Sequence, residues 1–208
     1  MEIYKEYFWG TSEILPYHKD RAKKIIKLLD SKAQPILDVG CGQGAIANYL
    51  IEEGYDVYGI DASKSGIEQA NKVNNGRFFV CNIYSKELPE QIKHIPFKTI
   101  ISMEVIEHLY DPRGYLSFVK NILYQNSGKY LIISTPYYGY WKNLLISIFN
   151  RWDIHHNPLW DGGHVKFWSR ETLNTILNEQ GFKIEKFMGC GRTPYLWVTM
   201  MVKAVIKK

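Results

Sequence analysis

At 208 residues the chain is long enough for one domain with a hydrophobic core and too short for two domains of ordinary size, so a single domain over residues 1–208 is expected. Hydrophobic residues make up 46% of the chain and charged residues 23%, a globular composition that excludes intrinsic disorder. The formal net charge of +5 is mild. The sequence lacks the basic stripe interleaved with aromatic residues that is typical of nucleic-acid binding.

Strands and helices are predicted to alternate up to residue 135. Apolar residues recur at helical spacing among lysines in residues 20–30, which predicts a surface helix before the first strand. Short apolar runs then predict five strands, with helical patterns between them. The strands are expected at residues 36–39, 57–61, 77–80, 99–103 and 129–135, and the helices at 45–53, 65–72, 90–94 and 112–124. Alternation of this kind indicates a parallel sheet with crossover helices.

The C-terminal part of the chain has a different pattern. Ser169 is expected to cap a helix over residues 171–180, which Gly181 ends. Two further strands, at 182–188 and 197–206, are joined by a loop and are therefore expected to be antiparallel neighbours. The expected fold is α/β: a Rossmann-like, seven-stranded, mostly parallel sheet with helices on both faces and a C-terminal antiparallel hairpin.

A glycine-rich turn follows the first strand, in the run Leu-Asp-Val-Gly-Cys-Gly-Gln-Gly over residues 37–44. Gly40, Gly42 and Gly44 alternate there, so the backbone can approach a ligand closely, and the N–H groups at the start of the next helix are free to bind it. The second strand ends at Asp61, a carboxylate suited to binding the two hydroxyls of a ribose. The turn is therefore predicted to bind a small charged or polar ligand.

The glycines alone leave two classes of cofactor open. The spacing of Gly40, Gly42 and Ala45 satisfies the loose G-x-G-x-x-G/A fingerprint of dinucleotide-binding enzymes, so an NAD-dependent oxidoreductase is one alternative. Asp38 inside the motif, and the antiparallel strands expected at the C-terminal end, favour a different family.

A resemblance to that family rests on two further segments. Residues 101–112, Ile-Ser-Met-Glu-Val-Ile-Glu-His-Leu-Tyr-Asp-Pro, and residues 164–173, His-Val-Lys-Phe-Trp-Ser-Arg-Glu-Thr-Leu, resemble class I S-adenosylmethionine-dependent methyltransferases. The enzymes of ubiquinone biosynthesis, and the broad group associated with cell-surface polysaccharide synthesis, are the most similar. The resemblance covers roughly residues 18 to 206 and implies S-adenosyl-L-methionine as the cofactor and an acceptor oxygen as the methylated atom. A non-catalytic module that binds the same cofactor is a second alternative.

The resemblance also assigns roles in cofactor binding. It implies that Gly40 and its neighbours face the methionine part, that Asp38 orders this loop, and that Asp61 binds the ribose hydroxyls. Asn82 stands where the family usually has an acidic residue that accepts a hydrogen bond from the adenine amino group. The predicted cofactor-binding residues are Asp38, Gly40, Cys41, Gly42, Gly44, Asp61, Ala62, Asn82, Ile83, Met103 and Glu104.

The catalytic residues are expected after the fourth strand. An alcohol or phenol loses a proton when it is methylated, and His108, with Glu107 beside it, is the predicted general base because a histidine ordinarily titrates near neutral pH. On a helical turn, spacings of three and four residues would gather Glu104, Glu107 and His108 on one side. Similar segments hold metal in small-RNA 2′-O-methyltransferases, where a downstream histidine completes the set, and His164 is the candidate here. A divalent cation such as Mg²⁺ would lower the pKa of the acceptor oxygen.

The aromatic segment over residues 137–164 is expected on the ligand side of the sheet, as a lid over the acceptor, a contact with a membrane or an extra packed helix. The resemblance to ubiquinone-type enzymes favours a small or lipid-linked acceptor, a sugar or a polyprenyl phenol, and peripheral contact with a membrane. Tyr7, Phe8 and Trp9 are expected either to fold over the cofactor or to cover the edge of the sheet.

A cytoplasmic location is expected. The three cysteines are odd in number and lack metal-ligand spacing, the first residues lack the order of a signal peptide, and the longest apolar run is far below the ~20 residues of a membrane-spanning helix. The sequence does not determine the oligomeric state.

Overall fold

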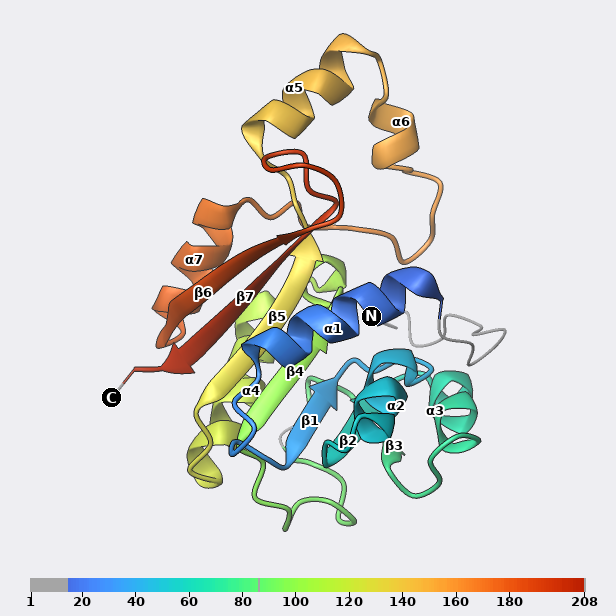
Figure 1. The fold of residues 1–208 in the computed structure, drawn as a ribbon, viewed down its shortest axis with the longest axis vertical. Coiled ribbons are helices and arrows are strands. Elements are labelled where there is room, and N and C mark those ends of the chain that lie inside the picture. Colours follow the sequence, from blue (N-terminus) through green and yellow to red (C-terminus); the bar gives the residue numbers. More distant parts are fainter. Residues whose placement is uncertain (1–14, 86, 208) are drawn as a thin grey trace.

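A seven-stranded sheet lies at the centre of the computed structural model, which describes residues 15–85 and 87–207 (Figure 1). Its strands are β1 (Ile36–Val39), β2 (Val57–Asp61), β3 (Phe78–Val80), β4 (Thr99–Met103), β5 (Tyr130–Pro136), β6 (Phe182–Cys190) and β7 (Thr199–Ile206). Their order is β3-β2-β1-β4-β5-β7-β6. Neighbours are parallel except at β7, which runs antiparallel to both β5 and β6. The predicted fold class is confirmed.

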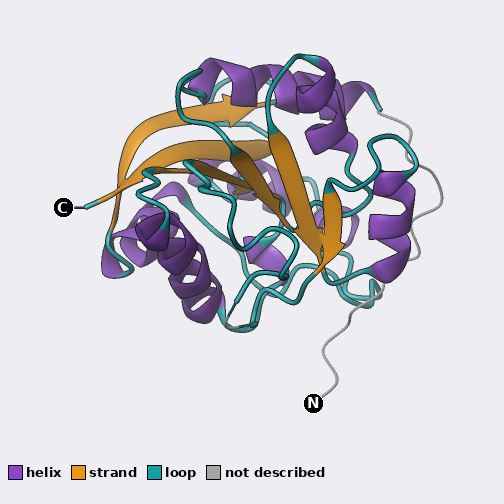
Figure 2. Cartoon of the chain, turned by 90° about the horizontal axis from the view of Figure 1, so that it is seen from below, coloured by secondary structure: helices purple, strands orange, loops and turns teal. Residues whose placement is uncertain are grey.

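Helices pack on both faces of this sheet (Figure 2). One face is covered by α1 (Pro16–Leu28), α2 (Ala45–Glu52) and α3 (Lys64–Asn71), and the other by α4 (Pro112–Gln125) and α7 (Arg170–Glu179). Ile25, Ile36 and Leu50 belong to one buried cluster, whereas Tyr115 and Leu177 belong to the other. Because both faces are covered, the central strand β1 is buried along its whole length, Asp38 included.

One predicted helix, over residues 90–94, is wrong. The chain forms turns there, in which the N–H groups of Ile92 and Lys93 both donate to the carbonyl of Pro89. The stretch between Pro89 and Pro96 is short, so the hydrogen bonds of a helix there would not offset the free energy of nucleating it. The buried side chain of Ile92 anchors this connection to the core instead.

The ends of several elements also differ from the prediction. The first helix begins at Pro16 rather than at residue 20, because proline is well tolerated in the first turn of a helix. The strand after Gly181 continues to Cys190, and the last strand begins at Thr199 rather than at residue 197.

The segment over residues 137–164 forms two short helices, α5 (Tyr140–Ile148) and α6 (Trp152–His155). Figure 1 shows both beyond the carboxyl end of the sheet, at the top of the view. Ile146 is buried, but many large apolar side chains of this segment are exposed. Within the described part of the chain, no helix is long and apolar enough to cross a bilayer.

Candidate active site

A cavity of about 510 Å³ opens at the carboxyl ends of β1, β2 and β4. The chain order of the strands reverses between β1 and β4, and open α/β sheets bind their ligands at such a point. Of the predicted cofactor-binding residues, all but Gly44 line the cavity: Asp38, Gly40, Cys41, Gly42, Asp61, Ala62, Asn82, Ile83, Met103 and Glu104. The roles of these residues stay predictions, but the structure brings them to one place.

A side chain is excluded at Gly40 and at Gly44 of the turn for two different physical reasons. Gly40 has a φ of 78°, and a Cβ atom there would collide with the side chain of Val105, which also lines the cavity. Gly44 begins α2 with a φ of 75°, and a Cβ atom there would lie 2.6 Å from the Cβ of Ala70. Gly40 therefore keeps the cavity wall in place, whereas Gly44 lets α2 pack closely against α3.

Asp61 is held at the cavity by two backbone N–H groups. Gly42 donates to Oδ2 and Ser63 donates to Oδ1, each at 2.8 Å. These bonds tie the glycine turn to the start of α3, where the Ser63 hydroxyl caps the helix by accepting from Gly66. A carboxylate oxygen accepts more than one hydrogen bond, so this arrangement is compatible with the predicted ribose contact.

Asp38 is 3% exposed and lines the same cavity. Burial, and then the negative charge of Asp61, raise the pKa of Asp38 to about 8. Two acidic groups therefore lie near one another in the cavity, and a ligand with positive charge would favour the ionised form of both.

Asn82 is fixed by a local turn. Its Oδ1 accepts a hydrogen bond from the backbone N–H of Tyr84 at 2.9 Å, so the amide is oriented by its own loop. Tyr84 lines the cavity as well.

The cavity also includes residues of α1 that the sequence did not predict, namely Tyr17, His18 and Arg21. Among the described residues, Arg21 is the only lysine or arginine that lines it. The lysines around Arg21 made this helix look like an ordinary surface helix, so no pattern in the sequence distinguished this side chain.

Arg21 belongs to a network around Glu104. Its guanidinium donates to Glu104 at 3.3 Å and to Thr199 at 3.1 Å, and the Ser134 hydroxyl donates to the same carboxylate at 2.7 Å. Glu104 has a φ of 57°, which is uncommon outside glycine. The network thus joins α1, β5 and β7 at the cavity and holds a strained residue in place.

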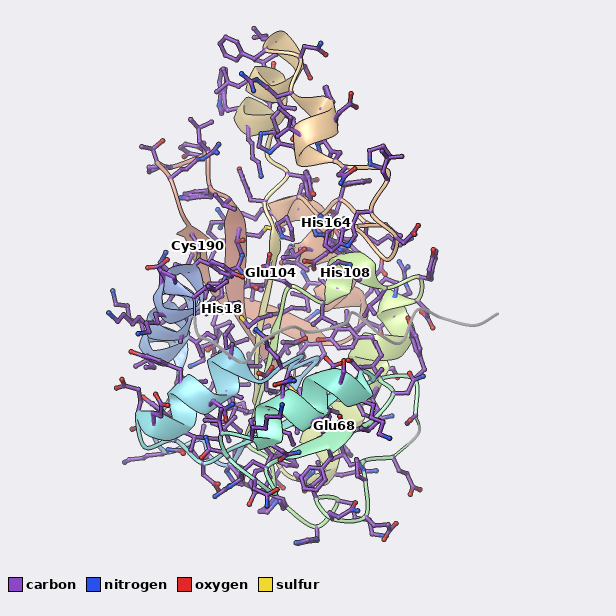
Figure 3. All side chains as sticks on the ribbon, turned by 90° about the vertical axis from the view of Figure 1, so that its right-hand side faces the viewer. His18, Glu68, Glu104, His108, His164 and Cys190 are labelled. Atoms are coloured by element: carbon purple, nitrogen blue, oxygen red, sulfur yellow. The ribbon has the colours of Figure 1, made fainter. Side chains whose placement is uncertain are left out.

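A second group forms where the short 3₁₀ turn η1 (Ile106–His108) meets the loop after α6. One ligand atom from each of Glu107, His108 and His164 lies within 4.8 Å of the others. The backbone carbonyl of Glu107 accepts from Val165 and Lys166, which holds the loop against this turn. Figure 3 shows His164 beside His108, with Glu104 on the side of α1. We call Glu107, His108 and His164 the histidine cluster.

The structure does not include Glu104 in the histidine cluster. The spacing argument assumed a continuous helical turn from residue 104, but η1 begins only at Ile106 and the backbone of Glu104 is left-handed. The carboxylate of Glu104 is held instead by Arg21, Ser134 and Thr199.

The two histidines are oriented by neighbouring polar groups. Nδ1 of His108 contacts the carbonyl oxygens of Gly162 and Gly163 at 2.8 and 3.2 Å, so it carries the proton and Nε2 carries the lone pair. Nδ1 of His164 lies 3.2 Å from the Tyr138 hydroxyl. Burial, and then the charge of His108, lower the pKa of His164 to about 4, which keeps this imidazole neutral at physiological pH.

Glu107 is fully buried, and among the described residues neither of its carboxylate oxygens has a hydrogen-bond partner of good geometry. Burial, and then the charge of Glu104, raise its pKa well above the usual range. A buried carboxylate beside two imidazoles is a donor set that fits a divalent cation, because the cation would supply the missing partner.

The sheet order, the glycine turn and the carboxylate at the end of β2 define a class I methyltransferase fold. A family model described as a methyltransferase domain matches residues 12–186, and the chain therefore belongs to this methyltransferase family. The predicted family and S-adenosyl-L-methionine as its cofactor are confirmed, and the NAD-dependent alternative is not supported.

Individual proteins agree with this assignment. The chain is 28% identical over 167 residues to the mitochondrial ubiquinone biosynthesis O-methyltransferase of Schizosaccharomyces pombe. The aligned region covers 76% of this chain and 58% of that relative. The fold of this chain is similar to that of magnesium protoporphyrin IX methyltransferase of Synechocystis PCC 6803 with bound SAH, with a TM-score of 0.64 and 17% identity. The match covers 91% of this chain and 82% of that one. The methyltransferase domain of bacterial CtHen1-C is also similar, with a TM-score of 0.65, 19% identity, and coverage of 92% and 100%. The chain spans less than two thirds of the length of the curated relatives it matches.

Proposed function

We propose that the protein is an S-adenosylmethionine-dependent O-methyltransferase that acts on a small or lipid-linked acceptor, such as a sugar or a polyprenyl phenol. The observation that carries this proposal is the position of His108 and His164, which line the cofactor cavity and carry oriented imidazoles. The curated relatives named as ubiquinone biosynthesis O-methyltransferases support oxygen as the methylated atom.

In this proposal the cavity binds the cofactor along its length. Asp61 accepts from the ribose hydroxyls, Ala62, Asn82 and Ile83 contact the adenine, and the glycine turn lies at the methionine end. Arg21 contributes the cavity's positive charge at the end where α1 meets Glu104. The cofactor supplies a methyl group on a positively charged sulfur, so the protein chiefly orients the acceptor and excludes water.

The histidine cluster would remove the acceptor's proton in one of two ways. Without a metal, Nε2 of His108 takes the proton as a general base. If a divalent cation were bound, Glu107, His108 and His164 would hold it, and it would lower the pKa of the acceptor hydroxyl. The metal route needs a neutral His164, which its buried position favours.

The proposal is tested by incubating the protein with methyl-labelled S-adenosylmethionine and a panel of catechols and sugars. Transfer of the label to a hydroxyl oxygen, located by NMR of the product, is the expected result. Binding of the cofactor without transfer to any acceptor would favour the non-catalytic module instead.

We expect chelation to distinguish the two routes. If a cation is bound, exhaustive treatment with EDTA lowers methyl transfer by about 10-fold or more, and added Mg²⁺ restores it. The variant Glu107→Gln should bind the cation more weakly in calorimetry, because it removes the charged ligand. Full activity after chelation would contradict the metal route and leave His108 as the base.

Replacing Arg21 with glutamine is expected to weaken binding of S-adenosylhomocysteine by about tenfold, because the cavity loses its positive charge and Glu104 loses its ion pair. Calorimetry measures this directly. Lys23→Gln is the matched control, since Lys23 is exposed on the same helix and does not line the cavity. Equal affinity of the Arg21 variant and the wild-type protein would exclude a role for Arg21 in cofactor binding.

Helices α5 and α6 are proposed to contact a membrane peripherally. Large apolar side chains are exposed along both helices, including Ile148 and Phe149. The double variant Ile148→Ser and Phe149→Ser should float with liposomes severalfold less than the wild-type protein. Tyr124→Ser, at an exposed aromatic position on α4, should change nothing. Failure of the wild-type protein to float would contradict the membrane contact.

A further inference from the structure

Positive charge gathers around α5, α6 and the loop between β6 and β7, from segments far apart in the sequence. Lys142 lies on α5, Arg151 and His155 lie at α6, and Arg192 lies in the loop between β6 and β7. Figure 1 shows this loop beneath α5. The N–H of Tyr137 donates to the carbonyl of Val198 at 3.0 Å, which ties the start of the α5 segment to the same loop. We call Lys142, Arg151, His155 and Arg192 the basic cluster.

Lys142 is the best-fixed member of the basic cluster. Its side chain is buried, with 8% of the residue exposed, and its Nζ donates to the carbonyl of Tyr137 at 2.8 Å. Lysine is almost never buried to this extent unless its charge has a partner. Among the described residues, the ammonium group has this one hydrogen bond, which satisfies one of its three donors.

The basic cluster lies next to the histidine cluster. Nζ of Lys142 is 5.3 Å from the centre of the Tyr138 ring, and the hydroxyl of Tyr138 is 3.2 Å from Nδ1 of His164. One tyrosine therefore separates the buried ammonium from the reacting end of the cavity. A group bound at Lys142 and Arg192 would belong to the same small molecule as a hydroxyl bound at His108 and His164.

Among the described residues, Lys142, Arg151 and Arg192 form no ion pair with a carboxylate. The negative charge of Glu104 acts on Lys142 without forming an ion pair with it. Burial, and then the charge of Arg192, lower the pKa of Lys142 to about 8. Burial, and then the charges of Lys142 and Arg192, lower the pKa of His155. The members therefore repel one another, and a bound anion would relieve that repulsion.

From this geometry we infer that the acceptor carries an anionic oxygen group, a carboxylate or a phosphate, which Lys142 and Arg192 bind while its hydroxyl faces the histidine cluster. The inference rests on the proposed O-methyltransferase function and narrows its substrate class. Arg192 is exposed and provides a planar fork that suits a carboxylate or a phosphate, whereas Lys142 provides a buried point charge whose position is fixed by its hydrogen bond to Tyr137.

The test compares two probes of nearly the same shape, protocatechuate and its uncharged amide, with inorganic phosphate as a third. Each is titrated by calorimetry into the full chain saturated with S-adenosylhomocysteine. We expect the carboxylate to bind about tenfold more tightly than the amide. Arg192→Gln and Lys142→Met should each lose most of this preference, while Lys23→Met, which removes an exposed charge from α1, should keep it. Circular dichroism checks that the Lys142 variant is folded, and Arg192 is tested independently.

Three outcomes would overturn the inference. The first is equal binding of the carboxylate and the amide, or no saturable binding of protocatechuate and phosphate. The second is a preference that survives in both variants. The third is loss of binding to phosphatidylglycerol vesicles in the variants with the protocatechuate preference unchanged, which would assign the basic cluster to lipid headgroups. Methyl transfer is measured separately, so an intact anion preference without any transfer would contradict the proposed function and not the anion site.

Discussion

Replacing His108 with asparagine is expected to lower kcat by about 10²- to 10³-fold, with cofactor affinity unchanged. The amide of asparagine can still donate to the carbonyl of Gly162, where Nδ1 of His108 donates now at 2.8 Å. The variant therefore keeps the loop in place and removes only the lone pair of Nε2. Steady-state kinetics with labelled cofactor, and calorimetry with S-adenosylhomocysteine, separate the two effects.

The matched control is His94→Asn, because His94 is exposed and does not line the cavity. This control should retain full activity. A His108 variant with kcat within about threefold of the wild-type value would remove the histidine cluster from the mechanism, since a general base or a metal ligand contributes far more than that.

Replacing Asp38 with asparagine is expected to stabilise the ligand-free protein by about 3 kcal/mol at pH 7, which is about 10 °C in Tm. The pKa of Asp38 is raised from 3.8 to about 8 by burial and by Asp61, so the folded state binds a proton that the unfolded state releases. The free energy of unfolding of the wild-type protein therefore falls as the pH rises from about 4 to about 8. Asparagine removes both this cost and its pH dependence.

Urea unfolding at pH 5 and pH 8 measures this effect, and the stability gap between the variant and the wild-type protein should be larger at pH 8. Asp153→Asn is the control, because Asp153 is exposed on α6. The same Asp38 variant should bind S-adenosylmethionine more weakly, since the positively charged ligand favours the ionised carboxylate of Asp38 and asparagine cannot ionise. A gap that does not grow with pH would contradict the assigned ionisation of Asp38.

Much of the fold was predictable because its signals are local. A buried run such as residues 36–39, followed by a glycine turn and a helical pattern, predicts one unit of a parallel sheet, and similar short apolar runs predicted the next four strands. The prediction of a helix at residues 90–94 is wrong because a turn, whose Ile92 side chain packs in the core, buries the same apolar residue. Patterns of this length do not separate the two structures.

The candidate site was predictable where residues directly follow strands. The carboxyl ends of parallel strands meet at one edge, so Gly40, Asp61 and Met103 had to lie near one another. Arg21 and Trp160 also line the cavity, but they reach it through the packing of α1 and the path of a long loop. Those contacts depend on tertiary structure, and no spacing in the sequence encodes them.

Glu104 shows a second limit of spacing arguments. A spacing of three positions between Glu104 and Glu107 predicts that both side chains lie on one face of a helix. The backbone of Glu104 is left-handed instead, and its carboxylate lies against Arg21 and Thr199. The structure therefore separates Glu104 from Glu107 and His108, which the spacing had grouped with it. His164, which the family resemblance supplied, does lie beside Glu107 and His108, and whether the group binds a metal stays a prediction.

Calorimetric titration of the wild-type protein and of Asp61→Ala with S-adenosylmethionine, and with NAD, tests the cofactor site most directly. We expect one saturable site for S-adenosylmethionine and no binding of NAD. The affinity of the Asp61 variant should be lower by about tenfold or more, because this variant loses the ribose contact and the hydrogen bond from Gly42. Binding of NAD in place of S-adenosylmethionine, or an Asp61 variant that binds as tightly as the wild-type protein, would contradict this expectation.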